Sequence, residues 1–393
     1  MKFEAINKPE KRLSPLIAAK PDCGCSTVVK ENSSFSSSSC AEAITAPYIS
    51  GFIKTEAGDI PRVFTVLSRR DKWETIKARF SSFRMSFSVK PGLYAAGDPD
   101  STSDIFVTAN YKMSFDALRR ELNGMNAWIL VLDTNGINVW CAAGKGTFGT
   151  DELVRRISRT GLQKIVSHRN LIVPQLGAPG IDSGEVKRKS GFRVIYGPVR
   201  SKDLGLYIQN GRKCDAEMRR VRFDIIDRLI LTPIELSQIF AKFHYFVLFV
   251  LIFFGMTSEG IIFRDSIVKG SFFLASGLLS IFAGAFFTPV FLPFIPFRAF
   301  TLKGWVAGII LFTGSFYVLG IFESYNIFLV ISAMILFPLL SSYLAFQFTG
   351  ASTYTSLSGV KKELKIALPV YISGTVISFI FLILYKIADW RLI

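Results

Sequence analysis

The pattern of hydrophobic and polar positions divides the chain into two regions. Between residues 51 and 235, short apolar runs alternate with polar stretches of helical periodicity, which predicts strands and helices in turn. From about residue 243, long apolar runs dominate, and several approach the roughly 20 residues that a helix needs to cross a bilayer. The pattern therefore predicts an α/β domain followed by an all-α transmembrane domain.

The α/β region is expected to form a mainly parallel sheet covered on both faces, because its strands alternate with helices. The predicted strands are 103–111, 127–133, 170–175, 192–199 and 218–223, and the short apolar segment 137–142 fits a strand or a helix start. The predicted helices are 114–122, 151–160 and 201–211, capped by Ser114, Thr150 and Ser201. Ligands of such sheets bind beyond the carboxyl ends of the strands. Those ends carry segments 108–114, 141–150, 174–180 and 197–201.

Five membrane spans are predicted in the C-terminal region, at roughly 243–263, 270–290, 304–322, 326–346 and 367–387. Pro289, Pro293 and Pro296 cannot continue a regular helix, so the second span is expected to end early. The first residues are charged and no apolar signal segment follows, which predicts a cytoplasmic N-terminal domain. Loop charges agree with this orientation in the inner membrane, because the loops on the N-terminal side carry Arg298, Lys303, Lys361, Lys362 and Lys365.

Residues 1–50 are expected to be a disordered tail, because segment 33–40 is serine-rich and no hydrophobic period is sustained. The tail contains Cys23, Cys25 and Cys40. A cytoplasmic location argues against disulfides, so the cysteines are free thiols or ligands. The Cys23-Gly-Cys25 pair suits a soft metal, although a tail cysteine without a role is the simpler interpretation.

Basic residues predominate in the N-terminal part of the chain. The formal net charge is +16, of which residues 243–393 contribute +4 and residues 1–242 contribute +12. Nucleic acid is one partner for a basic domain. A domain tethered beside anionic lipid headgroups is the better explanation here, so we expect membrane lipid and no nucleic acid as a partner.

Cys141 stands between bulky Trp140 and a run of small residues, far in sequence from the other cysteines. A buried structural cysteine is one interpretation. A catalytic nucleophile would need a base, and the only histidines are His168, which precedes a strand, and His244, which opens the first span. A Cys–His pair is therefore disfavoured. Lys145 and a nearby helix N-terminus would favour the thiolate, as a metal ligand requires.

Two common sites are excluded around Cys141. Segment 144–147 is not a phosphate-binding loop, because Gly146 follows Lys145 and Asn138 stands where that motif begins with glycine. A tetrahedral zinc site would need several cysteines or histidines at defined spacing. One soft ligand beside a crevice at the strand ends suits cobalt in a corrin ring. The D-x-H-x-x-G pattern of cobalamin proteins that use a histidine ligand is absent.

Two stretches carry a family resemblance. VKPGLYAAGDPDSTSDIFVTANYKMSFDALRREL (89–122) and LILTPIEL (229–236) resemble the corrinoid iron–sulfur protein of the acetyl-CoA pathway. GINVWCAAGKGTFGTDELVRRI (136–157), joined to five spans, resembles the HgcA family, the membrane corrinoid proteins of microbial mercury methylation, and segment 346–364 is similar to that family's loop before the last span. The likeness runs from about residue 60 to the end. The NVWCAAGK motif is specific, because the acetyl-CoA relatives lack its cysteine, whereas the serine-rich tail departs from the family.

The resemblance implies a Rossmann-like corrinoid-binding domain at 51–235 and a transmembrane domain at 243–393. It implies a cobalamin-type cofactor whose cobalt takes a methyl group from methyltetrahydrofolate and passes it to Hg(II), giving methylmercury. Cys141 would be the catalytic residue and the lower axial ligand of the cobalt. Because the chain has no four-cysteine set for an iron–sulfur cluster, a ferredoxin-like partner, HgcB in that family, would supply electrons.

Cofactor contacts are expected in the loops at the strand ends and along the NVWCAAGK motif. They are Thr108, Asn110, Ser114, Asn138, Val139, Trp140, Cys141, Ala142, Ala143, Gly144, Lys145, Gly146, Thr147 and Ser201. Two other functions remain open. A membrane-tethered methyl carrier of one-carbon metabolism would share the fold and the corrinoid but would not need Cys141. A transporter with a regulatory domain is disfavoured, because charged residues are scarce within the spans.

Overall fold

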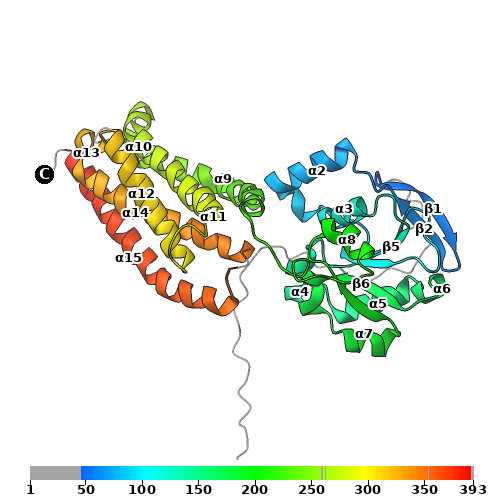
Figure 1. Cartoon of the computed structure of the whole chain (residues 1–393). Helices are drawn as coiled ribbons and strands as arrows, with labels where there is room; N and C mark the ends of the chain where they lie inside the picture. The colour runs from blue at the N-terminus through cyan, green and yellow to red at the C-terminus, as the bar shows by residue number, and fades with distance from the viewer. Residues whose placement is uncertain (1–45, 258–259, 262, 353, 391–393) are drawn as a thin grey trace, which may run out of the picture. The chain divides into compact units, whose positions relative to one another are not determined.

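A computed structural model describes residues 46–257, 260–261, 263–352 and 354–390 of the chain (Figure 1). The serine-rich tail and its three cysteines lie outside the described residues up to position 45, so the predictions made for them stay predictions.

A seven-stranded sheet forms the centre of the α/β region, in the order β1-β2-β3-β5-β4-β6-β7. The strands are β1 (Ile49–Thr55), β2 (Gly58–Val63), β3 (Gly92–Ala96), β4 (Ile105–Ala109), β5 (Ala127–Leu132), β6 (Asn170–Pro174) and β7 (Arg193–Gly197). Strands β5, β4, β6 and β7 run parallel, as does the β2–β3 pair. The β1–β2 and β3–β5 pairs are antiparallel, so the sheet is mixed and its parallel half carries the predicted strand ends.

Helices connect these strands and bury the middle of the sheet. They are α2 (Arg69–Phe80), α3 (Lys112–Glu121), α4 (Val139–Lys145), α5 (Thr150–Arg159), α6 (Leu162–Ile165), α7 (Ser183–Ser190) and α8 (Leu204–Gln209), with 3₁₀ turns η1 (Ser82–Met85), η2 (Gln175–Gly180) and η3 (Ser201–Asp203). Every residue of β4 and β5 is buried. Strands covered on both faces have nearly continuous apolar sequences, which explains why these two were predictable.

The three predicted helix caps are wrong. Helix α3 begins at Lys112, before Ser114, because the backbone N–H of Lys112 already donates to the Phe87 carbonyl oxygen (3.0 Å). Thr150 is the first residue of α5, and its hydroxyl instead accepts from the Asp182 N–H (2.8 Å). Ser201 opens the turn η3 without a side-chain cap.

Two segments that were considered as strands do not form strands in the structure. Segment 218–223 is not a strand: one backbone hydrogen bond, from the Val199 N–H to the Met218 carbonyl oxygen (2.8 Å), ties it to the end of β7. Its three arginines do not suit a buried strand. The ambiguous segment 137–142 begins helix α4, because the Asn138 side chain accepts the Cys141 N–H (2.9 Å) as an N-cap.

Among the described residues of the second region, five helices are long and apolar enough to cross a membrane, which agrees with the five predicted spans. The elements are α9 (Ile225–Gly255), α10 (Phe263–Ile281), the π-helical η4 (Phe282–Phe287), α11 (Thr288–Val290), α12 (Phe300–Val318), α13 (Ile321–Ser324), α14 (Ile327–Gln347), η5 (Phe348–Ala351) and α15 (Leu357–Asp389), with the small hairpin β8 (Met256–Thr257) and β9 (Gly260–Ile261). Helix α9 starts well before residue 243, so the expected boundary at 235–243 lies within it and stays a prediction.

Helices α12 and α14 pack through small residues. A Cβ atom on Gly304 would come within 2.7 Å of the Ser341 carbonyl oxygen, and one on Gly308 within 3.0 Å of the Pro338 Cα. The Ser341 hydroxyl donates to the Gly304 carbonyl oxygen at 2.8 Å. Small residues let membrane helices approach closely, and dispersion contacts and hydrogen bonds then hold them together.

The α/β region is expected to fold without the membrane helices. Its core cluster draws on residues 53–196 alone, so a fragment of residues 47–223 carries every member of that core. We expect this fragment to be monomeric and soluble and to show cooperative unfolding, measured by size-exclusion chromatography and urea denaturation. A fragment recovered only as aggregate would show that the division into two regions is wrong.

Candidate functional site

A pocket of about 290 Å³ opens at the carboxyl edge of the parallel strands. It lies among β4, β6 and the end of β7, with α3, α4, η2 and η3 around it. Its lining is mostly apolar, with Phe106, Val107, Thr108, Ser114, Ala117, Leu118, Asn138, Val139, Trp140, Ile172, Pro174, Leu176, Gly197, Pro198, Val199, Ser201 and Leu204. The site thus occupies the crevice in which open α/β sheets bind ligands.

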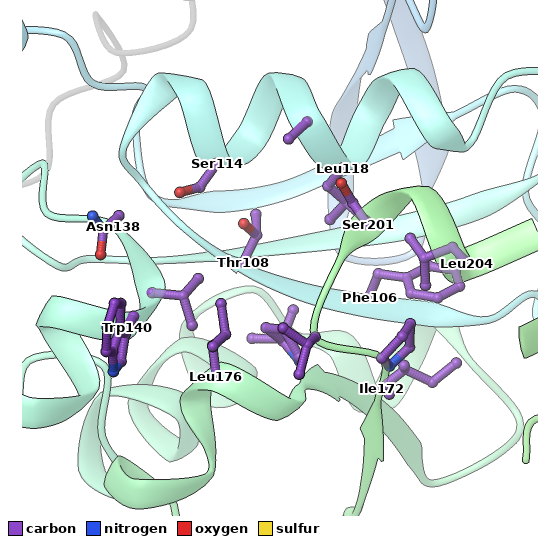
Figure 2. A pocket seen from close by; sticks show the side chains of 17 residues that line it. Phe106, Thr108, Ser114, Leu118, Asn138, Trp140, Ile172, Leu176, Ser201 and Leu204 are labelled. Carbon is purple, nitrogen blue, oxygen red and sulfur yellow. The ribbon is translucent and has the colours of Figure 1, made fainter. Parts of the chain in front are cut away.

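Polar side chains gather on one wall of the pocket (Figure 2). Thr108, Ser114 and Ser201 lie there, on β4, α3 and η3, with Asn138 beside them. Within the described part of the chain, none of the three hydroxyls has a hydrogen-bond partner, although Thr108 is only 3% exposed. Because these hydroxyls line the pocket and have no protein partner among the described residues, they are available for a ligand.

The facing wall is apolar (Figure 2). Trp140, Leu176 and Ile172 form it, from α4, η2 and β6. Trp140 is 40% exposed, so a large flat surface is open to solvent at the pocket. Leu176 and Ile172 were not predicted from the sequence as site residues. Leu176 does lie in segment 174–180, which was expected at the ligand-binding edge.

Asn110 organises the neighbouring loop and does not line the pocket. Its amide oxygen accepts from the Thr134 N–H (3.0 Å), the Thr134 hydroxyl (2.8 Å) and the Gly136 N–H (2.9 Å). Its amide nitrogen donates to Asp133 (3.3 Å). These bonds hold the loop from β5 to α4 and thereby position Asn138 and Trp140. A direct contact between Asn110 and a cofactor stays a prediction.

The small residues of α4 pack the helix tightly against η2. Ala142 and Ala143 are buried, and a Cβ atom on Gly180 would come within 3.1 Å of the Ala143 Cα. Close packing against the protein therefore explains these two alanines. Cys141 is exposed on the first turn of α4, directly after Trp140, and is not among the residues that line the pocket.

The end of α4 presents an open surface. A Cβ atom on Gly144 would meet nothing within 4 Å, and Gly144 and Lys145 are both exposed. Gly146 ends the helix in the left-handed region, with φ of 80°, which only glycine adopts without strain. The Thr147 hydroxyl donates to the Ala142 carbonyl oxygen (3.4 Å) and so closes the turn.

His168 lies at the other edge of the sheet. Its Nε2 is 2.9 Å from the Ser103 carbonyl oxygen, and its Nδ1 accepts the Asn170 N–H at 3.2 Å, near the amino ends of β4 and β6. This confirms that His168 cannot pair with Cys141. Among the described residues, no group of three metal-ligating side chains is present.

A buried ionic cluster joins α2 to α3, and the sequence analysis missed it. The Lys112 Nζ lies 2.8 Å from an Asp71 oxygen and 2.7 Å from an Asp116 oxygen. Arg119 pairs with the same two carboxylates, at 3.0 and 2.7 Å. Burial opposes ionisation of Asp71, but hydrogen bonds from Lys112 and Ser68 outweigh it and hold the pKa of that carboxyl well below its ordinary value. In the sequence, the i,i+4 spacing of Lys112 and Asp116 and the i,i+3 spacing of Asp116 and Arg119 could have indicated these ion pairs.

The pocket lies within the part of the chain that is similar to known proteins. Residues 67–208 match the family model of the CO dehydrogenase/acetyl-CoA synthase delta subunit. This agrees with the resemblance of the α/β region to the corrinoid iron–sulfur protein of the acetyl-CoA pathway.

Several archaeal proteins are similar to part of the chain. The acetyl-CoA decarbonylase/synthase complex subunit gamma of Archaeoglobus fulgidus is 30% identical over 149 residues, 37% of this chain and 31% of the relative. The Methanocaldococcus jannaschii subunit is 28% identical over 153 residues, with the same shares of each chain, and subunit gamma 2 of Methanosarcina thermophila is 33% identical over 122 residues, 30% of this chain and 26% of the relative. The chain therefore spans about a third or less of each relative.

Proposed function

We propose that this protein is a membrane-tethered, corrinoid-dependent methyl-transfer protein, of the kind that carries methyl groups in one-carbon metabolism. The observation that carries this proposal is the pocket at the strand ends, where unpartnered hydroxyls face an apolar wall. The match of residues 67–208 to the delta-subunit family model and the similarity to acetyl-CoA decarbonylase/synthase subunits support it.

The pocket fits part of a corrinoid. A corrin is a flat, largely apolar ring whose edge carries amide groups, and amides pair with hydroxyls. Thr108, Ser114 and Ser201 provide hydroxyls without protein partners, and Trp140 provides a flat apolar surface. Because 290 Å³ is too small for a whole corrinoid, the remainder would lie over the open surface at Gly144.

The protein's own groups have distinct roles in this proposal. When bound, the corrinoid supplies a cobalt that accepts a methyl group and releases it to an acceptor. The hydroxyls of Thr108 and Ser201 would bind and orient the ring edge. Trp140 and Leu176 would exclude water from one side. Asn110 would hold the loop that carries Asn138 in place through its four hydrogen bonds.

Hg(II) is a second candidate acceptor, and Cys141 is the observation that favours it. The thiol is exposed on the turn that follows Asn138 and Trp140. A thiolate donating to the cobalt would raise its electron density, and the methyl group must leave with electrons to join electrophilic Hg(II). The resemblance to the HgcA family adds methyltetrahydrofolate as methyl donor and a ferredoxin-like protein such as HgcB as electron donor.

The membrane region would hold the α/β region at the lipid surface. Five apolar helices are compatible with a multi-pass membrane protein. We propose the cytoplasmic membrane as the location, with the α/β region facing the cytoplasm, because the basic loops then lie on the inner side. An optical spectrum of protein purified with its corrinoid tests the proposal, since it reports both the cobalt and sulfur ligation.

Gly144→Val is expected to weaken cobalamin binding at least about tenfold. The valine side chain enters open space, so the fold should survive, whereas a ring lying over this surface would collide with it. Co-elution of cobalamin absorbance with the protein measures the effect. Gly51→Val is the matched control, because Gly51 also faces open space but lies on β1, at the far edge of the sheet. Stoichiometric binding by a folded Gly144→Val protein would contradict this placement.

A further inference from the structure

A second and larger cavity, of about 950 Å³, lies within the helical region. It is formed by α12, α14, α15 and the segment that precedes α15, with Arg298, Ala299, Thr301, Leu302, Trp305, Leu339, Ser342, Tyr354, Thr355, Ser356, Gly359, Lys362, Glu363, Ile366, Ala367, Val370 and Tyr371 as its lining. This volume is near the upper end of the range for ligand pockets, about 300–1,000 Å³. Six residues of segment 346–364 also line the cavity, and the proposed function assigns them no role.

Contacts between the helices place the cavity at one shared end. The Ser342 hydroxyl donates to the Thr301 carbonyl oxygen (2.7 Å) and lies 2.9 Å from the Tyr371 hydroxyl, whereas Ser332 meets Ser378 at 2.8 Å. Helices α14 and α15 therefore run in opposite directions, and the start of α12, the end of α14 and the start of α15 lie together. For helices that span a bilayer, such an end lies near the level of the headgroups.

The cavity has an apolar wall and a polar mouth. Leu302, Trp305, Leu339, Ile366 and Val370 supply the apolar part. Tyr354, Thr355 and Ser356 belong to the segment before α15 and supply hydroxyls. A ligand that fills this space must combine an apolar body with a polar head.

Two cationic side chains at the cavity indicate the charge of the polar headgroup that it would bind. Arg298 and Lys362 both line the cavity and are exposed, and neither forms an ion pair within the described part of the chain. Glu363 is the acidic residue among the lining residues, and its carboxylate accepts the Thr301 N–H at 2.6 Å, at the start of α12. Two cations beside an apolar wall complement an anionic head.

We propose that this cavity binds an anionic phospholipid of the bilayer. Its phosphate lies between Arg298 and Lys362, and an acyl chain follows the wall that contains Trp305. Basic pockets between membrane helices bind anionic headgroups in this way. A soluble anion would leave the apolar wall unfilled, and the bilayer presents lipid to the cavity continuously. The bound lipid would join the start of α15 to the start of α12.

Native mass spectrometry of the detergent-solubilised full-length protein, titrated with phosphatidylglycerol or phosphatidylcholine, tests the proposal. The unmodified protein should retain phosphatidylglycerol in preference to phosphatidylcholine. Arg298→Gln/Lys362→Gln should retain it about thirtyfold more weakly, because each cation near an anionic group contributes about fivefold. Lys361→Gln/Lys365→Gln removes two exposed cations from the same stretch but outside the cavity lining, so its retention should be unchanged.

Three results would overturn the proposal. The first is equal weakening in both double variants, which would indicate a general surface-charge effect. The second is full retention in Arg298→Gln/Lys362→Gln. The third is displacement of phosphatidylglycerol by equimolar inorganic phosphate, which would indicate a site for a free anion. Ala367→Leu, which adds bulk at the apolar wall, should weaken retention with both cations intact, and the charge variants decide the question if this one fails to fold.

Discussion

Cys141→Ala is expected to leave the protein at its normal level in the membrane but to reduce methylmercury formation by more than about 100-fold. Cys141 is exposed, and the backbone bond from its N–H to Asn138 survives the substitution, so α4 should form normally. The substitution removes the Cys141 thiolate, the soft anionic ligand proposed for the cobalt. Loss of a partner in a metal's outer shell costs roughly 10–100-fold, and loss of a direct ligand should exceed this. Methylmercury formed per mole of protein in isolated membranes is the measurement.

The companion variants separate ligation from packing. Cys141→Thr and Cys141→His each supply a donor atom, but neither supplies a soft anion, so both should also lose most of the activity. Cys214→Ala is the matched control, because Cys214 is the other cysteine in the described residues and its thiol only donates weakly to the Tyr196 carbonyl oxygen (3.7 Å). Normal methylation by Cys141→Ala would eliminate the ligand role and leave the one-carbon methyl carrier. Activity that follows protein abundance would indicate a packing role.

Lys112→Met is expected to destabilise the α/β region by about 3–5 kcal/mol, because it leaves two carboxylates buried with one fewer cation. Asp71 and Asp116 would keep Arg119 as their cationic partner. Hydrogen exchange of the β4 and β5 amides, measured in the full-length protein, reports this loss locally. Lys72→Met is the control, since Lys72 is exposed on α2 directly beside Asp71. Unchanged protection in Lys112→Met would show that the cluster contributes no stability.

The same cluster has a distinct pH signature. The pKa of Asp71 is lowered in the folded protein, so its contribution to stability is present above the ordinary carboxyl pKa of about 3.9 and is lost as the pH falls below it. Lys112 donates one of the hydrogen bonds that lower this pKa. Amide protection should therefore fall more steeply in acid for the unmodified protein than for Lys112→Met. Equal slopes would argue against the assignment to Lys112.

Local pattern was sufficient to predict much of the fold. Strands β4 and β5 are buried on both faces, so each is a continuous apolar run that can be recognised without its neighbours. The five long apolar helices follow from length and hydropathy alone. The strand-end rule likewise pointed to Thr108, Ser114, Asn138 and Ser201, and all four line the pocket at that edge, whereas their contact with a cofactor stays a prediction.

Pairings between segments distant in the chain could not be predicted from the sequence. Strand β3 runs antiparallel to β5, and Ser114 lost its expected cap position because Tyr111 pairs with Ser88, far earlier in the chain. Asn110 was predicted to contact the cofactor, and in the structure its side chain hydrogen-bonds to the loop at 133–136. A local sequence pattern does not predict which distant segment will hydrogen-bond to a given polar side chain.

Both cavities were also decided by tertiary structure. The apolar wall at Leu176 and Ile172 exists only because η2 folds over the end of β6 beside α4, and no periodicity in segment 174–180 shows it. The cavity at Arg298 and Lys362 arises because α14 runs opposite to both α12 and α15, which brings residues some 60 positions apart to one end. Sequence periodicity determines which face of an element is apolar, because that depends on neighbouring residues. Which faces meet, and what space they leave, depends on packing across the whole chain.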